Sequence, residues 1–168
     1  MNVNEPASAQ VLGTDGGRPA PWAEARERLA GARSYWTATS HPSGRPHMRP
    51  VLAVWVGDAL YLSSDPGARK SRNLDADAHC SIAATCDDMD LVIEGKAVRV
   101  TDPQQLKNVA AEYKAKYGWP VTIVDAAFTA PYAAPTAGDG PFAVYEVEPA
   151  TVFGFPTSDK FAPTRWRF

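Results

Sequence analysis

The sequence predicts a mainly β protein: an antiparallel barrel of Greek-key type with flanking helices. About seven or eight short runs rich in β-branched and aromatic residues are bounded by turn residues. Tight turns join several of them, and Gly57-Asp58 is the clearest two-residue connection. Helical periodicity is confined to two or three segments, without the strand–helix alternation of a doubly wound parallel sheet. An antiparallel barrel with helices at its ends is therefore expected.

Composition and charge limit the possible partners. The chain has 168 residues, of which 45% are hydrophobic, and this is sufficient for one globular domain. A net charge of −2 provides no general attraction to nucleic acid or to an anionic membrane, so neither is expected as a partner and any anion site must be local. No secretory signal or membrane span is recognisable, which predicts a cytoplasmic protein. Residues 1–20 are expected to be a flexible arm before a single domain over 21–168.

The first elements follow from spacing and turn residues. Apolar residues three and four apart predict a helix over Trp22–Ala32, followed by an extended segment. His47–Val56 and Ala59–Ser64 read as two strands that pair through Gly57-Asp58. Asp65-Pro66 then supplies a capping residue and a first helical position for a helix that runs to about Ala76.

The second half of the chain continues the β pattern. One further helix, Pro103–Tyr117, has a start signal at Asp102 and a stop signal at Gly118. The segment 119–140 is either an irregular crossover or a lid over a pocket. The remaining strands are expected at Cys80–Cys86, Leu91–Val100, Phe142–Glu148, Thr151–Phe155 and Thr164–Phe168. The two cysteines would lie about 20 Å apart on one strand, too far for a mutual disulfide.

The second predicted helix carries an unusual charge pattern at its start. Arg69, Lys70 and Arg72 lie where the helix already presents partial positive charge, so a negative ligand, most simply a phosphate, would relieve the repulsion. The alternative is a solvated basic face. Helical spacing allows Arg69, Arg72 and Asn73 to converge, and the preceding Ser63-Ser64 adds hydroxyl donors.

Other chemistries lack their motifs. The sequence contains no GxxxxGK[ST], no GxGxxG after a strand, no HExxH, no CxxC and no GxSxG. A nucleoside triphosphatase, a Rossmann fold, a metal site and a serine hydrolase are therefore not supported. The ending TRWRF would place Trp166 on one face of a strand and Arg165 on the other, as an edge strand that packs on a dimer partner or binds a ligand. Trp22, Trp36 and Trp55 are expected in the core.

Three segments resemble a known superfamily. GRPHMRPVLAVW, LYLSSDPGARKSRNL and LVIEGKAVRV are similar to the flavin- and deazaflavin-binding split β-barrels named after pyridoxamine 5′-phosphate oxidase. The resemblance spans about residues 35–100 and implies a split barrel. It implies that one strand runs beside the cofactor ring, while a strand end and the next helix hold the cofactor phosphate. Cofactor-binding residues on this basis are His47, Arg49, Pro50, Val51, Leu52, Ser63, Ser64, Arg69, Lys70, Asn73 and Arg165.

Two departures bear on the substrate. Vitamin-B6 oxidases carry a lysine where this chain has Val54, and an Arg-x-His where it has Arg165-Trp166-Arg167. Both differences disfavour pyridoxamine phosphate. KSRNL and TRWRF instead resemble the branch that uses coenzyme F420, whose polyanionic tail would suit Arg45 and Arg72.

The function expected from the resemblance is a homodimeric oxidoreductase that binds reduced F420 and transfers a hydride to a small organic acceptor. The cofactor carries that chemistry, so no catalytic residue is assigned. The alternatives are an FMN-dependent oxidoreductase of the same fold and a non-catalytic binder of flavin, deazaflavin or haem.

Overall fold

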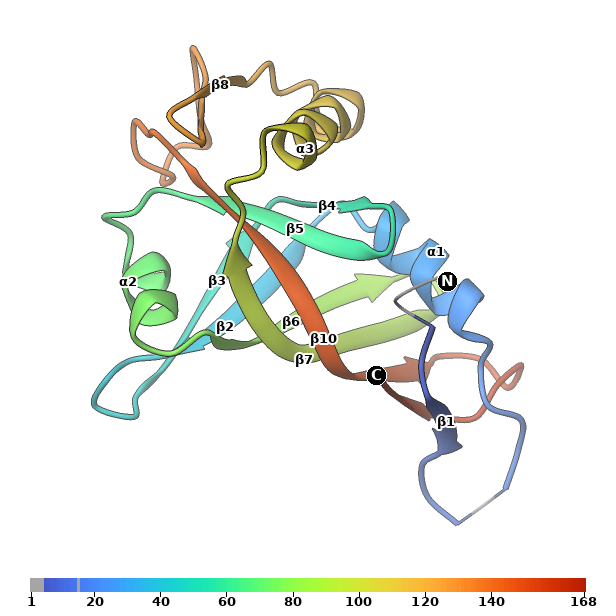
Figure 1. The fold of residues 1–168 in the computed structure, drawn as a ribbon. Helices are drawn as coiled ribbons and strands as arrows, with labels where there is room; N and C mark the ends of the chain where they lie inside the picture. Colours follow the sequence, from blue (N-terminus) through green and yellow to red (C-terminus); the bar gives the residue numbers. More distant parts are fainter. Residues whose placement is uncertain (1–4, 15) are drawn as a thin grey trace.

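The computed structural model describes residues 5–14 and 16–168. Within them the chain forms a nine-stranded sheet, a separate two-stranded sheet and three helices (Figure 1). The helices are α1 (Trp22–Gly31), α2 (Arg69–Ala76) and α3 (Pro103–Tyr117). The strands are β1 (Ser8–Val11), β2 (Tyr35–Ser40), β3 (Pro46–Val51), β4 (Ala53–Val56), β5 (Ala59–Ser64), β6 (His79–Cys86), β7 (Met89–Arg99), β8 (Thr122–Val124), β9 (Ala127–Thr129), β10 (Ala143–Pro156) and β11 (Thr164–Arg167).

The large sheet is antiparallel and curls into an open barrel. Seven strands follow the order β4-β5-β10-β7-β6-β2-β3. The end strands β3 and β4 are consecutive in the chain and are separated only by Leu52. They share no ladder of hydrogen bonds, so the sheet is not closed. The fold class predicted from sequence, a mainly β split barrel with flanking helices, is confirmed.

The strand expected over 47–56 is divided at Leu52. Its first half, β3, pairs with β2, and only its second half, β4, pairs with β5 across Gly57-Asp58. Side chains of α3 donate to the backbone at the division: the Tyr113 hydroxyl to the carbonyl of Leu52 at 2.9 Å, and the Tyr117 hydroxyl to the carbonyl of Ala53 at 2.9 Å. These bonds matter because a carbonyl at the point where a ladder is interrupted needs another donor.

Two apolar cores lie on opposite sides of the barrel wall. The first fills the barrel interior and includes Leu29 of α1 and Trp166 of β11, both buried. The second lies between the barrel and α3, where Val109 and Tyr113 pack with the aromatic residues that follow the helix. Figure 1 shows α3 and β8 together on one side of the barrel, with α2 at a separate edge.

The expected helix boundaries hold for α1 and α3. The Asp102 side chain accepts a hydrogen bond from the Gln105 amide, and Gly118 ends α3 with a left-handed φ of 66°. The expected cap of α2 is wrong: its N-cap is Ala68, and the Asp65 side chain instead accepts from the Gly67 amide in the preceding turn. Both cysteines are free, as expected.

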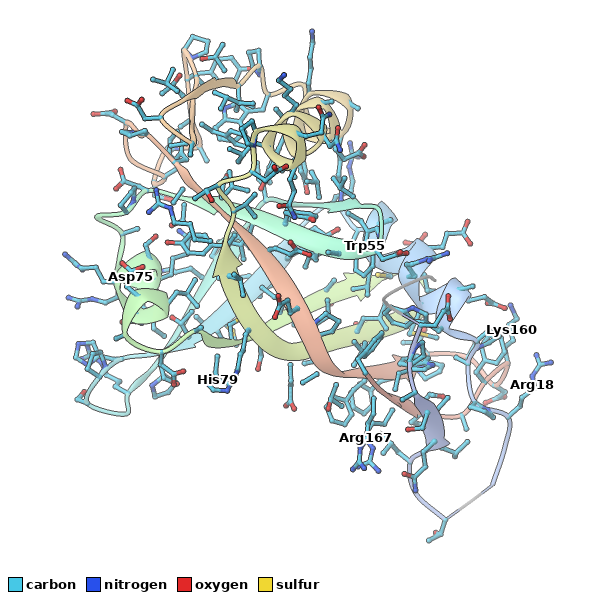
Figure 2. All side chains as sticks on the ribbon, viewed as in Figure 1. Arg18, Trp55, Asp75, His79, Lys160 and Arg167 are labelled. Carbon is cyan, nitrogen blue, oxygen red and sulfur yellow. The ribbon has the colours of Figure 1, made fainter. Side chains whose placement is uncertain are left out.

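The C-terminal region differs from the prediction in two ways. The runs 142–148 and 151–155 form one long strand, β10, with an irregularity between Pro149 and Thr151. TRWRF is not an edge strand, because β11 lies between β10 and β1. Residues 8–11 of the expected flexible arm form β1. The predicted alternation is present: Trp166 is buried, whereas Arg167 is exposed and projects outward in Figure 2.

Of the three tryptophans expected in the core, Trp22 is buried and Trp55 is partly buried against the first core. Trp36 is 49% exposed, so its assignment was wrong. In β2 the alternate residues Tyr35 and Thr37 face inward, which turns Trp36 outward. None of the described helices is long and apolar enough to cross a membrane.

We predict that Gly95→Ala destabilises the fold by about 2 kcal/mol or more, near the upper part of the range for overpacking. A Cβ at Gly95 would lie 2.0 Å from the Glu148 carbonyl oxygen, where β7 and β10 approach closely beside the irregularity. Gly31→Ala is the control, because a Cβ there meets nothing within 4 Å. Chemical denaturation should show a large loss in the free energy of unfolding for Gly95→Ala only. Equal stability of the two variants would refute the close approach of β7 and β10.

Candidate functional site

A pocket of about 310 Å³ opens beside the division between β3 and β4. One wall is the backbone stretch Pro50–Leu52, and another is the end of β5 at Ser63-Ser64. Its volume lies at the lower end of the range for small-molecule sites. The lining residues are Pro50, Val51, Leu52, Ser63, Ser64, Lys70, Tyr117, Trp119, Tyr132, Ala133, Ala134, Thr136, Ala137 and Phe142.

The segment after α3 covers this pocket. It contains the β8-β9 hairpin and then a loop, here called the lid loop (residues 130–141). The Trp119 indole donates to the Tyr132 carbonyl at 2.8 Å, and the Tyr132 hydroxyl donates to the Gly118 carbonyl at 2.9 Å. The Trp119 and Phe142 rings meet edge to face at 5.4 Å. The sequence left two interpretations of residues 119–140, an irregular crossover and a lid over a pocket. These contacts support the lid.

The pocket lining combines apolar and polar groups. Aromatic and alanine side chains from the end of α3 and from the segment after it supply the apolar part, here called the apolar end, and Ser63 and Lys70 supply the polar part, here called the polar end. Burial lowers the pKa of the half-buried Lys70 ammonium; Asp65 opposes this effect and Arg49 adds to it. An anion in the pocket would favour the charged amine and offset the desolvation. The arrangement suits a flat apolar molecule that carries a negative group.

Further cations surround the polar end. Burial lowers the pKa of His47, and the positive charges of Arg49, Lys70, Arg69 and Arg45 lower it further, in that order. The His47 Nδ1 atom is buried and has no hydrogen-bond partner among the residues that the structure describes. We call the four charged residues, Arg45, Arg49, Arg69 and Lys70, the cation cluster. It concentrates positive charge in a protein whose net charge is −2.

The structure separates Asn73 from the arginines of its own helix. Asn73 is buried and donates through Nδ2 to the Thr39 hydroxyl at 3.0 Å, whereas Arg69 and Arg72 are exposed. The expected convergence of these three side chains is therefore not found. The Ser64 hydroxyl is also buried and is already hydrogen-bonded to Ser71 at 2.7 Å.

Arg165 lies far from the pocket in the single chain. It pairs with Phe153 on β10, ten residues along that strand from Ala143, which pairs with Ser64 at the pocket. At about 3.3 Å per residue, that separation is roughly 30 Å. The Arg165 guanidinium instead donates to the Gln10 side chain at 2.5 Å. Its assignment to the cofactor stays a prediction.

Sequence reasoning missed the roof of the pocket. Tyr117, Trp119, Tyr132 and Phe142 come from the end of α3 and from the segment after it. Three of these four lie in or beside a stretch rich in proline and glycine. Aromatic residues in such a loop were the available signal that it contributes to a binding site. Without the fold, nothing in the sequence indicated that this stretch lies against Pro50–Leu52.

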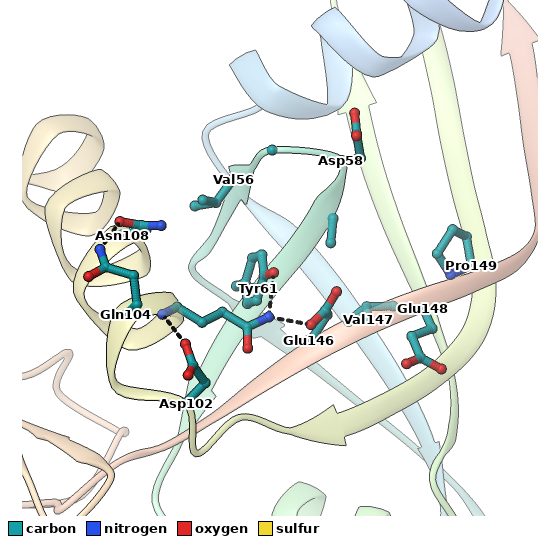
Figure 3. A pocket seen from close by; sticks show the side chains of 13 residues that line it. Val56, Asp58, Tyr61, Asp102, Gln104, Asn108, Glu146, Val147, Glu148 and Pro149 are labelled. Carbon is teal, nitrogen blue, oxygen red and sulfur yellow. Dashed lines mark hydrogen bonds between the residues drawn. The ribbon is translucent and has the colours of Figure 1, made fainter. Parts of the chain in front are cut away.

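A second groove, of about 650 Å³, lies between the start of α3 and β5 and β10 (Figure 3). Asp102, Glu146 and Glu148 line it, so its charge disfavours a phosphate. The Gln105 side chain donates to the Tyr61 hydroxyl at 2.9 Å and to Glu146 at 2.5 Å. Among the described residues, no group of three or more His, Cys, Asp or Glu could hold a metal ion.

Solved structures share this fold. A conserved hypothetical protein from Mycobacterium tuberculosis superposes with a TM-score of 0.63 at 18% identity, covering 89% of this chain and 88% of its own. A heme binding protein from Mycobacterium smegmatis has a TM-score of 0.61 at 22% identity, covering 82% of this chain and 55% of its own. A pyridoxamine 5′-phosphate oxidase-related, FMN binding protein from Nostoc punctiforme has a TM-score of 0.53 at 20% identity, covering 82% and 84%.

At these identities the similarity concerns the fold. A comparison with proteins that have curated descriptions finds no match. The model of the pyridoxamine 5′-phosphate oxidase family, in contrast, matches residues 21–155, which include the seven strands of the barrel except the last residue of β10, and the pocket wall at Pro50–Leu52. The chain therefore belongs to the pyridoxamine 5′-phosphate oxidase family.

Proposed function

We propose that the pocket binds a flavin-type cofactor, with the ring at the apolar end and the first phosphate beside Ser63 and Lys70. The observation that carries the proposal is the pocket itself, in which an aromatic roof and the Pro50–Leu52 backbone lead to a half-buried lysine that forms no ion pair with the other described residues. The orphaned Nδ1 of His47 and the surrounding cations fit an anionic ligand. FMN binding by the Nostoc relative agrees with this assignment.

Within this class we propose coenzyme F420 as the cofactor and a small organic molecule as the hydride acceptor. The deazaflavin ring supplies the hydride chemistry when bound, while the chain binds and orients it. The polyanionic tail distinguishes F420 from FMN. Arg45, Arg49 and Arg69 are exposed members of the cation cluster, which places positive charge next to the first phosphate site where a longer anionic tail would run.

FMN is the alternative ligand for the same pocket. Haem is less favoured, although the relative from M. smegmatis binds it. The pocket-lining residues that the structure describes include Tyr117 and Tyr132 but no His, Cys or Met, which are the commoner axial ligands. A cationic polar end is also not required for haem iron, whereas a phosphate ester uses it directly.

We propose a homodimer that forms through the outer face of the barrel. Cross-strand pairing aligns Phe153, Val92, Ala83, Trp36 and Pro50 in one row across five strands. At about 4.8 Å between strands, the row is roughly 20 Å wide. Trp36 is 49% exposed, and apolar patches of this kind mark protein interfaces. A second copy of the chain is the occupant proposed for it.

Lys70→Ala should weaken FMN or F420 binding by about 1.5 to 3 kcal/mol, roughly ten- to 150-fold, the range for a hydrogen bond to a charged group. Arg72→Ala is the matched control for FMN, because Arg72 is on the same helix but exposed. Isothermal titration calorimetry on folded variants measures both. Equal affinities of wild type and Lys70→Ala would exclude Lys70 from the site.

The two cofactors should respond differently to salt. We expect F420 to bind at least about tenfold more tightly than FMN at low salt, since several exposed charge pairs of about 0.2 to 1 kcal/mol each would add to the first phosphate contact. Screening over roughly 8 to 10 Å should reduce that preference as salt rises. Fluorescence titrations at two ionic strengths test this. If FMN bound more tightly than F420 at every salt concentration, F420 would be excluded as the cofactor and FMN would take its place in the proposal.

Trp36→Glu should convert the dimer to monomers, because it places a charge within the apolar row. Val124→Glu is the control: Val124 is 50% exposed but lies on β8, outside the barrel face. Light scattering of the two variants and the wild type gives the masses. A wild type that remains monomeric at high concentration would contradict the proposed dimer.

A further inference from the structure

Helix α2 is attached to the barrel mainly by polar contacts. Its buried residues are Ser71, Asn73 and Leu74, so only one large apolar side chain holds it. The Ser71 hydroxyl lies 2.7 Å from the Ser64 hydroxyl and 2.7 Å from the Asp65 carbonyl. A helix held by so little apolar surface depends on such contacts for its orientation.

The two polar residues lie on either side of Lys70 around the helix. At about 100° per residue, Lys70 and Leu74 occupy the arc between Ser71 and Asn73. Ser71 is tied to the end of β5, and Asn73 is tied to Thr39 on β2, so the two anchors reach different strands. Rotation of the helix in either direction would break one of them. Both anchors are 1% exposed or less, where a hydrogen bond is protected from water.

We propose that Ser71 and Asn73 are positioning residues that hold α2 at the rotation in which Lys70 lines the pocket and Arg69 and Arg72 face solvent. Asn73 thus acts through Lys70 rather than by touching the ligand. The nature of that ligand rests on the proposed function, but the geometry of the anchors does not. This assignment also explains why a short, strongly charged helix presents its least accessible cation to the pocket.

The environment of Lys70 provides a readout that a general loss of stability would not move. Burial lowers the pKa of Lys70, Asp65 in the preceding turn opposes this and Arg49 on β3 adds to it. The other titratable groups in these surroundings are His47 and Arg69. If an anchor is removed, the helix can turn and Lys70 becomes hydrated. Its pKa should then rise toward the ordinary lysine value.

The test uses ligand-free protein with isotope-labelled lysine side chains, titrated by NMR, with Lys70→Ala to assign the signal. Asn73→Ala and Ser71→Ala should each raise the pKa of Lys70. Thr39→Val removes the Asn73 contact from the other side and should reproduce the effect, with little further change in the double variant. Ile82→Val, a buried change on β6, is the destabilising control and should leave Lys70 unchanged.

A second measurement connects the anchors to binding. In wild type, Lys70→Ala should weaken FMN binding at least tenfold; in the Asn73→Ala background the same change should cost less than threefold. An unchanged Lys70 titration in Asn73→Ala and Thr39→Val would overturn the positioning role. Failure of the wild type to bind FMN or F420 would refute the cofactor proposal alone, because the NMR titration judges the anchors without ligand.

Discussion

The division of one strand at Leu52 is the constraint on which the rest of the structure depends. β3 and β4 are consecutive in the chain yet stand at opposite ends of the seven-stranded barrel, so the ladder of hydrogen bonds cannot continue through the residue between them. Tyr113 and Tyr117 of α3 donate to the carbonyls exposed there. The same contacts fix the end of α3, and with it the lid loop (residues 130–141). The pocket is therefore a direct product of the open barrel.

Electrostatics adds the second requirement. The protein carries little net charge, but the cation cluster gathers positive side chains around one end of the pocket. Lys70 is half-buried and would be costly as an unpaired charge unless an anion offsets its desolvation. The arginines of the cluster remain hydrated, so their cost is small and their effect on a ligand is screened by salt. An anionic ligand with one enclosed negative group and several exposed ones would match this change from a half-buried lysine to hydrated arginines.

Much of the architecture was predictable from the sequence, because it follows from local rules. The limits of α3 come from Asp102 and Gly118, and the β4-β5 turn from Gly57. The walls at Pro50–Leu52 and Ser63-Ser64 came from the family resemblance. The division at Leu52 was not predictable, since a continuous β pattern gives no sign that its halves pair with different strands. The direction of Asn73 was missed for a similar reason: spacing places a residue on a helix, but neighbouring elements decide which side is buried.

We propose that the cofactor ring lies between Pro50–Leu52 and the lid loop and that its first phosphate lies beside Lys70. A crystal structure of the protein with bound F420, and a second with FMN, tests it most directly. We expect ring density against the Leu52 backbone and under Trp119, with a phosphate within hydrogen-bonding distance of the Lys70 ammonium. Cofactor density in the acidic groove at Tyr61, or a phosphate remote from Lys70, would contradict it.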